Sequence, residues 1–235
     1  MWNCWCRHRF GLHNKMRIHG ASPWEPLHHI QLGAYKYLKQ ALFLQLGESS
    51  KLGHQFDALC EANGQLLHRQ SDRNLPRTTF TDGIREGKLQ AHEMTGVMTL
   101  ILVTVRSTAG RNLLMNAKNS AKQREFLGDE NSMRDWIRVL EYHLMFEEFS
   151  KQKEMKVHHL ERAKIKIREL MALTKHTAKR TKGMGHNTVN YHAFIHLPQI
   201  YLDLAAAMYL NTQDNEHHHI PTKGVADRTL SLIHI

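Results

Sequence analysis

The stretch SMRDWIRVLEYHL, from Ser132 to Leu144, decides the fold class of this chain. Its apolar side chains recur at every third or fourth position, which is the period of one face of an α-helix. Ser132 suits the N-cap of such a helix, and Asp135 places an acid in the first turn, where the helix dipole favours it. The pattern predicts an amphipathic helix with one buried side. That side holds Met133, Trp136, Ile137, Leu140 and Leu144.

The same periodicity continues on both sides of this stretch. Towards the C-terminus it predicts a helix over residues 154–176, whose inner positions are Val157, Leu160, Ala163, Ile167, Leu170, Met171 and Thr174. Towards the N-terminus it predicts one helix from Leu27 to a break at Gly47, and a second over residues 51–69. The second helix turns Leu52, Phe56, Leu59 and Leu66 inward.

Two further segments complete the expected architecture. The run GVMTLILVTV within residues 88–105 is rich in β-branched side chains and suits a buried strand or a buried helix. Its length together with the polar residues before it favours the helix. Pro198 should interrupt the chain before a short helix over residues 201–209. We therefore predict a mainly α protein with at most a few short strands.

Positive charge is concentrated in one part of the chain. The 235 residues carry a formal net charge of +10. Between residues 151 and 182, eleven basic residues stand against three glutamates, so this segment supplies a surplus of eight charges. Such a stripe on the outer face of a helix can neutralise phosphates, although a solvated face without a partner is the alternative. The residues predicted to contact DNA are Lys156, Arg162, Lys164, Lys166, Arg168, Lys179 and Arg180.

Other sequence features limit the possible cellular locations of the chain. The longest apolar run, Val97 to Val105, is about half of the ~20 residues that a bilayer-spanning helix needs, so no membrane partner is expected. The N-terminus, MWNCWCRHRF, lacks the apolar core of a signal peptide. Three cysteines cannot all pair. These features favour a reducing compartment, and with DNA as the partner they predict a nuclear location.

The sequence offers three histidine or cysteine arrangements that could hold a metal. Cys4, Cys6, His8, His13 and His19 could ligate zinc, but the C-x-C spacing is unusual and no second cysteine pair follows, so zinc is not expected. His192 and His196 would share a helix face, with ordinary hydrogen bonds as the favoured interpretation. The run from His217 to His219 suits a polar surface.

Several motifs resemble those of a known enzyme family. WEPLHHIQLGAYKYL resembles the D-x-L-H-x-x-x-x-G segment of CACTA, Plavaka and KDZ-like transposases, with Glu25 at the position of the aspartate. GKLQAHEMTGVMTLILV resembles the helical insertion of these enzymes. GMGHNTVNYHAFIHLPQI and MYLNTQDNEHHHIPTK are similar to their closing segment, where a strand leads to an acid at the position of Glu216. The resemblance covers most of residues 20–229 and is closest to transposon-derived reading frames of diatoms and similar microbial eukaryotes.

The resemblance implies an RNase H-like catalytic fold that a helical insertion interrupts. Its remnants would be residues 1–46 and 186–229, with the insertion at residues 47–185. The final segment, residues 230–235 (LSLIHI), resembles a translated sequencing adapter and is expected to be an artefact.

The resemblance also implies a two-metal reaction. Glu25 and Glu216 would be catalytic ligands of Mg²⁺ in a parent that cuts and joins DNA by phosphoryl transfer. The first catalytic aspartate should precede Trp24, yet the earliest aspartate is Asp57. We therefore expect a truncated and inactive chain. The alternatives are a non-enzymatic basic helical protein that binds nucleic acid, and a zinc-stabilised interaction protein.

Overall fold

The chain folds as an assembly of helices. The computed structural model describes residues 27–47, 51–66, 84, 89, 91, 93–115, 130–152, 155–179, 185–186 and 188–204. Within these residues 88% of positions are helical and no strand occurs, which confirms the prediction of a mainly α protein. The helices are η1 (Leu27–Tyr35), α3 (Lys36–Leu46), α4 (Lys51–Leu66), α6 (Glu93–Arg106), α7 (Thr108–Met115), α8 (Glu130–Ser150), α9 (Val157–Thr177), α10 (Val189–Phe194) and α11 (Leu197–Leu204).

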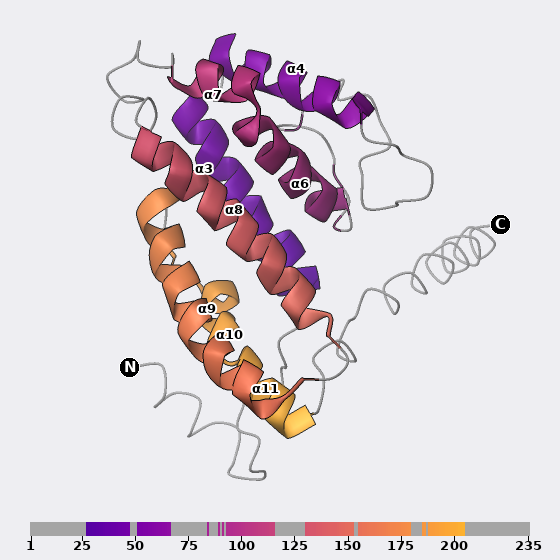
Figure 1. Ribbon diagram of the computed structural model, residues 1–235, viewed down its shortest axis with the longest axis vertical. Coiled ribbons are helices and arrows are strands. Elements are labelled where there is room, and N and C mark those ends of the chain that lie inside the picture. The colour runs from indigo at the N-terminus through magenta and orange to yellow at the C-terminus, as the bar shows by residue number, and fades with distance from the viewer. Residues whose placement is uncertain are drawn as a thin grey trace, which may run out of the picture.

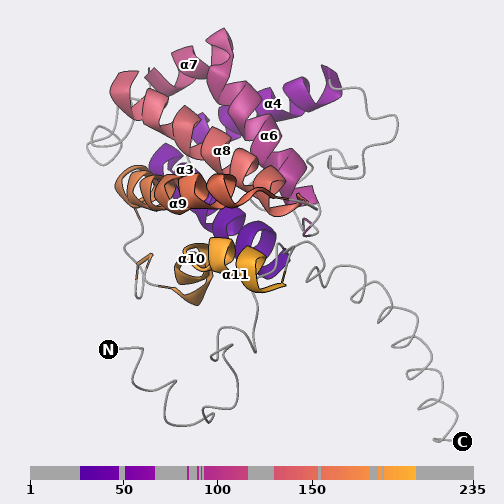
Figure 2. The ribbon, with the colours of Figure 1, turned by 60° about the horizontal axis from the view of Figure 1, so that its bottom comes forward.

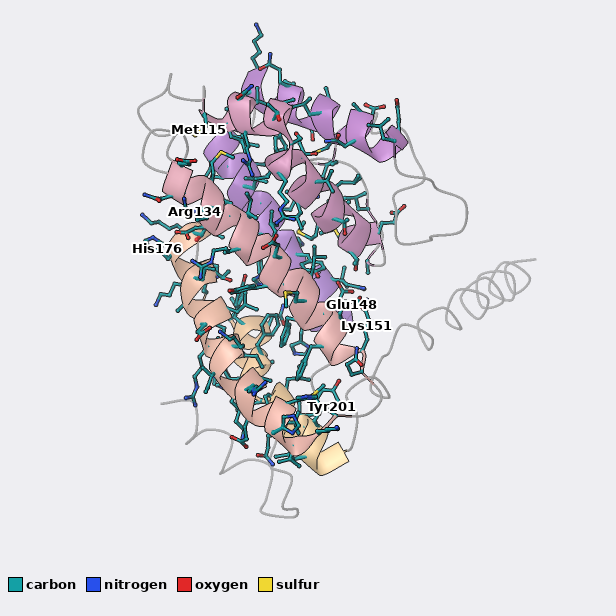
Figure 3. All side chains as sticks on the ribbon, viewed as in Figure 1. Met115, Arg134, Glu148, Lys151, His176 and Tyr201 are labelled. Atoms are coloured by element: carbon teal, nitrogen blue, oxygen red, sulfur yellow. The ribbon has the colours of Figure 1, made fainter. Side chains whose placement is uncertain are left out.

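Helix α8 lies at the centre of the described part. It packs against α6 on one side and against α9 on the other (Figure 1). Figure 3 shows the start of α8, at Arg134, beside the end of α9, at His176, so these two helices run antiparallel. Helices α4 and α7 cover one end of α6. At the other end of the molecule α10 packs on η1, and α11 packs on α9 (Figure 2).

One connected apolar core joins the helices. In the predicted helical segment from Leu27 to Gly47, Ile30, Tyr35, Leu38, Leu42 and Leu46 are all buried. The run GVMTLILVTV lies in α6 and contributes several buried side chains, which confirms the buried helix. Helix α3 ends at Gly47, as predicted, with a φ of 86° that favours glycine.

Most predicted faces of α8 and α9 are confirmed. Met133, Trp136 and Leu140 of α8 are buried, and so are Leu160, Ala163, Ile167, Leu170 and Thr174 of α9. Helix α8 begins at Glu130, so Ser132 lies within the first turn and the predicted N-cap is wrong. Val157 is 64% exposed because it is the first residue of α9 and lies before the packed part of the helix.

The predicted inner face of α4 is partly wrong. Leu66 is 79% exposed at the last position of the helix. Helix α4 packs against α6 and α7, and its buried face includes small and polar side chains that the apolar period does not indicate. Its buried members are Gly53, Phe56, Asp57, Cys60 and Gly64.

The segment expected to hold the closing strand is helical. Residues 189–194 and 197–204 form α10 and α11. The buried side chains Tyr191, Phe194, Leu197 and Tyr201 recur at every third or fourth position, and that period suits a helix. Pro198 lies in the first turn of α11, where its missing N–H leaves no intrahelical hydrogen bond unmade, so it starts a helix there.

The end of α8 is held by α11. The Tyr201 hydroxyl lies 2.9–3.1 Å from the carbonyl oxygens of Phe149, Ser150 and Gln152. These belong to the last turn of α8 and the chain just after it, where carbonyls lack intrahelical donors. Among the described helices, none combines the length and apolar character needed to cross a bilayer.

Candidate nucleic-acid interface

The basic side chains of α9 form two separate rows. Lys164, Arg168 and Lys175 each follow a buried residue, whereas Arg162 and Lys166 each precede one. Because successive helix positions are rotated by ~100°, the two sets lie on opposite edges of the buried face. We call Lys164, Arg168 and Lys175 the open edge, and Arg162 and Lys166 the groove edge.

The outermost strip of α9, between these two edges, carries the acids Glu161 and Glu169 and no lysine or arginine. Ile165 is 59% exposed at its centre, and His158, Ala172 and His176 are exposed beside it. The described cations expected on the outer side of α9 are exposed or half-buried, and most of them lie in two rows along that side. The reason is the position of the buried face, since burial of Ala163 and Ile167 turns their neighbours sideways.

Acidic neighbours neutralise part of this charge. Lys164 forms an ion pair of 2.8 Å with Glu161, and Lys166 forms one of 2.7 Å with Glu169. Ion pairs between exposed side chains are screened by water and contribute little, so a phosphate can displace them. Within the described residues, Arg168 and Lys175 form no ion pair. An anion can therefore contact these two cations of the open edge without first breaking an ion pair.

The remaining predicted contacts are distributed differently. Lys156 precedes the first residue of α9 and is exposed, and Lys179 is exposed just beyond its last turn. Arg180 lies outside the described residues. The described cations thus extend over the full length of one 21-residue helix.

The predicted metal ligands cannot be placed in the fold. Glu25 and Glu216 both lie outside the described residues, as do the N-terminal Cys4, Cys6, His8, His13 and His19 and the run from His217 to His219. Within the part of the chain that is described, no three histidine, cysteine or acidic side chains gather closely enough to hold a metal ion.

The histidine pair does come together. The Nε2 atoms of His192 and His196 are 3.0 Å apart at the surface near the end of α10. This distance fits a hydrogen bond from a protonated ring nitrogen to an unprotonated one. The arrangement agrees with the ordinary hydrogen bond that the sequence favoured, and no third ligand among the described residues joins the pair.

A buried acid was missed by the sequence interpretation. Glu147 of α8 is fully buried, and its carboxylate accepts hydrogen bonds from Tyr35 at 2.6 Å, Gln31 at 3.2 Å and Thr95 at 2.9 Å. Lys151 lies 3.1 Å away and forms an ion pair with it. The site joins η1, α6 and α8. The sequence does contain one sign that Glu147 is buried. It follows Leu140 by seven residues and His143 by four, a spacing that places it on the inner side of the helix.

Burial controls the protonation of the groups around Glu147. Desolvation, with the adjacent carboxylate as a second cause, raises the pKa of the Tyr35 hydroxyl well above its usual value, so this group remains a hydrogen-bond donor. Desolvation lowers the pKa of His143 to about 4. The cluster is therefore a carboxylate among neutral donors and one ammonium group, an arrangement that satisfies a buried charge.

No family model, curated protein or solved structure matches this chain. What the chain does must therefore follow from its own side chains. The exposed cations of α9 offer a surface for an anion, whereas the Glu147 cluster is enclosed and serves the packing of three helices.

Proposed function

We propose that this chain is a DNA-binding helical part of a transposase-like protein, and that it holds DNA through the phosphate backbone. The open edge of α9 carries the proposal, because Arg168 and Lys175 are exposed there without an ion pair among the described residues. The net charge of +10 attracts a polyanion over longer distances. A nuclear location follows from this partner.

In this proposal the open edge contacts phosphates and does not read bases. Lysine and arginine side chains on phosphates fix position without specifying sequence. Each contact releases condensed counterions, so affinity falls as salt rises, with a slope of about −0.9 per phosphate neutralised in duplex DNA. Three residues of the open edge would supply up to three such contacts.

The experiment compares two triple variants of equal charge. Lys164→Ala/Arg168→Ala/Lys175→Ala removes the open edge, while Lys36→Ala/Lys51→Ala/Arg111→Ala removes three exposed cations from α3, α4 and α7. Binding to a labelled duplex of ~20 base pairs is measured between about 50 and 200 mM salt. We expect the slope of log affinity against log salt to fall by about 2–3 in the first variant and by less than about 1 in the second.

The control variant shows whether DNA binding depends on the open edge or only on the net charge of the chain. Equal losses in the two triple variants would show that only net charge matters, and a wild-type affinity independent of salt would show that no phosphate is contacted. Either result contradicts the proposed interface. Circular dichroism of both variants checks that the helices remain folded.

The transposase relation is a separate part of the proposal. It rests on the resemblance of the motifs around Glu25 and Glu216, with Mg²⁺ as a Lewis acid that would stabilise the attacking and leaving oxygens in the intact parent. The all-helical described part of residues 47–185 is compatible with a helical insertion. The chain as given is proposed to be inactive. A nicking or strand-transfer assay with Mg²⁺ or Mn²⁺ tests this, and turnover that Glu216→Gln abolishes would contradict it.

A further inference from the structure

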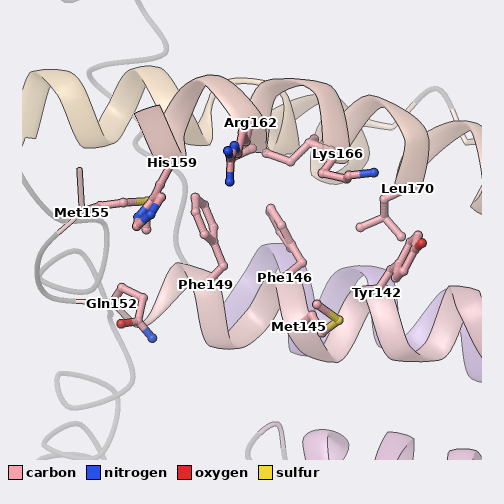
Figure 4. A pocket seen from close by; sticks show the side chains of 12 residues that line it. Tyr142, Met145, Phe146, Phe149, Gln152, Met155, His159, Arg162, Lys166 and Leu170 are labelled. Carbon is pink, nitrogen blue, oxygen red and sulfur yellow. The ribbon is translucent and has the colours of Figure 1, made fainter. Parts of the chain in front are cut away.

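A groove runs between α8 and α9 on the side opposite the open edge. Its volume is about 630 Å³. Figure 4 shows the rings of Phe146 and Phe149 rising from α8 towards α9, with Arg162 above them and Lys166 beside them. Met145 and Tyr142 continue the apolar floor towards Leu170.

The floor of the groove exposes Met145 next to two aromatic rings. Met145 is 66% exposed and Phe149 is half-buried, whereas Phe146 is buried, and the two rings stack with centroids 6.4 Å apart. Exposed apolar patches on soluble proteins often mark an interaction site. Methionine suits such a surface because its flexible, polarisable side chain adapts to the shape of a partner.

The rim of the groove is positively charged. Arg162 and Lys166 line it together with His159, and among the described lining residues there is no aspartate or glutamate. Arg162 is exposed and forms no ion pair within the described residues, while Lys166 can exchange its surface pair with Glu169 for another carboxylate. The rim therefore favours a partner that presents negative charge beside an apolar strip.

The length of the groove indicates the size of the partner. On α8 its lining extends from Tyr142 to Phe149 and continues to Gln152 just after the helix, and on α9 it extends from His159 to Leu170. Ten residues of helix correspond to ~15 Å, or about three turns. A third helix laid between two antiparallel helices fits this shape, and helix-in-groove binding uses apolar anchors at positions i, i+3, i+4 and i+7.

We propose that the α8–α9 groove binds a short acidic amphipathic helix from another protein. Its apolar side would cover Met145, Phe146 and Phe149, and carboxylates along its flank would meet Arg162 and Lys166. A second copy of this chain is a poorer occupant, because two molecules that each carry a net charge of +10 repel one another.

The test uses two synthetic helical peptides of ~14 residues with the same apolar positions. One carries glutamate at every flanking position and the other carries lysine there. Binding to the full chain is measured by fluorescence anisotropy of the labelled peptides. We expect the acidic peptide to bind at least about tenfold tighter than its lysine counterpart, which corresponds to 1.4 kcal/mol.

Variants of the chain locate the binding. Arg162→Glu and Met145→Glu should each weaken the acidic peptide at least about tenfold. Arg168→Glu is the matched control, because it makes the same charge reversal on the open edge of α9 and should change peptide affinity by less than about twofold. Circular dichroism confirms that each variant is folded.

Several outcomes would overturn the proposal. These are no binding, equal affinity for both peptides, equal weakening by Arg162→Glu and Arg168→Glu, or displacement of the peptide by micromolar oleate, which would assign the groove to a small amphiphile. The salt dependence of DNA binding is measured on the same preparation. A retained salt slope with no peptide binding would reject the groove partner and leave the DNA interface standing.

Discussion

Glu147 shows how one residue can organise several helices. An ionised carboxylate away from water is stable only when hydrogen bonds and an opposite charge replace its hydration. Tyr35 and Gln31 reach it from η1, and Thr95 reaches it from α6. Because the donors come from separate parts of the sequence, the cluster fixes how these helices lie along α8.

His143, one turn before Glu147, makes stability depend on pH. Its Nδ1 lies 2.9 Å from the carbonyl oxygen of Val139, and burial lowers its pKa to about 4. The unfolded state binds a proton near pH 6.5 and the folded state only near pH 4, so folding becomes less favourable as pH falls through this window. We predict that His143 contributes roughly 2–3 kcal/mol to this loss.

Urea unfolding at pH 7 and pH 4.5 measures the effect. His143→Leu, which keeps an apolar volume in the core, should lose less stability between the two pH values than the wild-type chain. His158→Leu is the control, since His158 is exposed on α9 and its replacement should leave the pH dependence unchanged. Identical pH dependence of the wild type and His143→Leu would refute the prediction.

The sequence identifies some buried residues of α8 better than others. The apolar period correctly predicts burial of Met133, Trp136 and Leu140. The period places Glu147 and His143 on that same side of the helix, but it does not show that they are buried. Acidic and histidine side chains are recognised as buried only when their hydrogen-bond partners are in place.

At the scale of elements, η1 and α10 approach each other unusually closely. Helix η1 is a π-helix, and a Cβ at Gly33 would lie 2.7 Å from the carbonyl oxygen of His28 and 3.0 Å from Nδ2 of Asn190. Gly33 is the glycine of the segment that resembles the transposase motif. Its lack of a side chain allows the contact between the two helices.

We predict that Gly33→Ala destabilises the chain by about 1–3 kcal/mol because the new methyl group must displace backbone or α10. In an unconstrained helix the same change would stabilise by up to about 1 kcal/mol, so the sign of the effect is informative. Urea unfolding measures it, with exposed Lys36→Ala as the control, which should stay within about 0.5 kcal/mol. A stabilised Gly33→Ala variant would argue against the close approach.

Helices with a regular spacing of apolar residues could be predicted from the sequence. Elements that were assigned from the family resemblance were predicted less well. Helix α9 was expected over residues 154–176 and spans Val157–Thr177, since its apolar positions repeat over six turns. The strand expected in the segment GMGHNTVNYHAFIHLPQI came from the motif similarity. The local spacing of Tyr191, Phe194 and Leu197 already favoured a helix, and packing on η1 provides its buried side.

At the scale of the whole molecule, side-chain hydrogen bonds tie distant parts of the described chain to one core. Trp136 of α8 donates to Gln45 of α3 at 2.8 Å, and Gln45 donates to the carbonyl oxygen of Thr177 at 3.0 Å. Asn63 of α4 donates to Thr104 of α6 at 2.9 Å. Separate unfolding of one helix would break bonds in its neighbours, so cooperative unfolding is expected.

Cys60 provides a probe of this cooperativity. Its side chain is fully buried in α4, and burial raises the pKa of its thiol to about 12. In a Cys4→Ser/Cys6→Ser background, we predict that Cys60 reacts with a disulfide reagent at least about a hundredfold more slowly in the native state than in urea. The urea midpoints from labelling and from circular dichroism should coincide. Rapid native labelling would show that α4 opens independently.

The sequence predicted the cations of α9, but it did not predict the groove between α8 and α9. The surplus of charge on residues 151–182 is visible in composition, so the cations of α9 were predicted. The groove was not, because it requires the antiparallel placement of α8 and α9, which brings Phe149 beside Arg162. Glu25 and Glu216 lie outside the described residues, and their role stays a prediction.

The separation of the two cationic rows of α9 has a consequence for assembly. A rigid helix only ~10–12 Å across would keep two simultaneously bound partners at a fixed short spacing. The helix would then act as a bivalent adaptor, raising the local concentration of an acidic peptide near a nucleic-acid duplex without any change of shape. Recruitment would depend on geometry, and a proline inserted in the middle of α9 would uncouple the two partners.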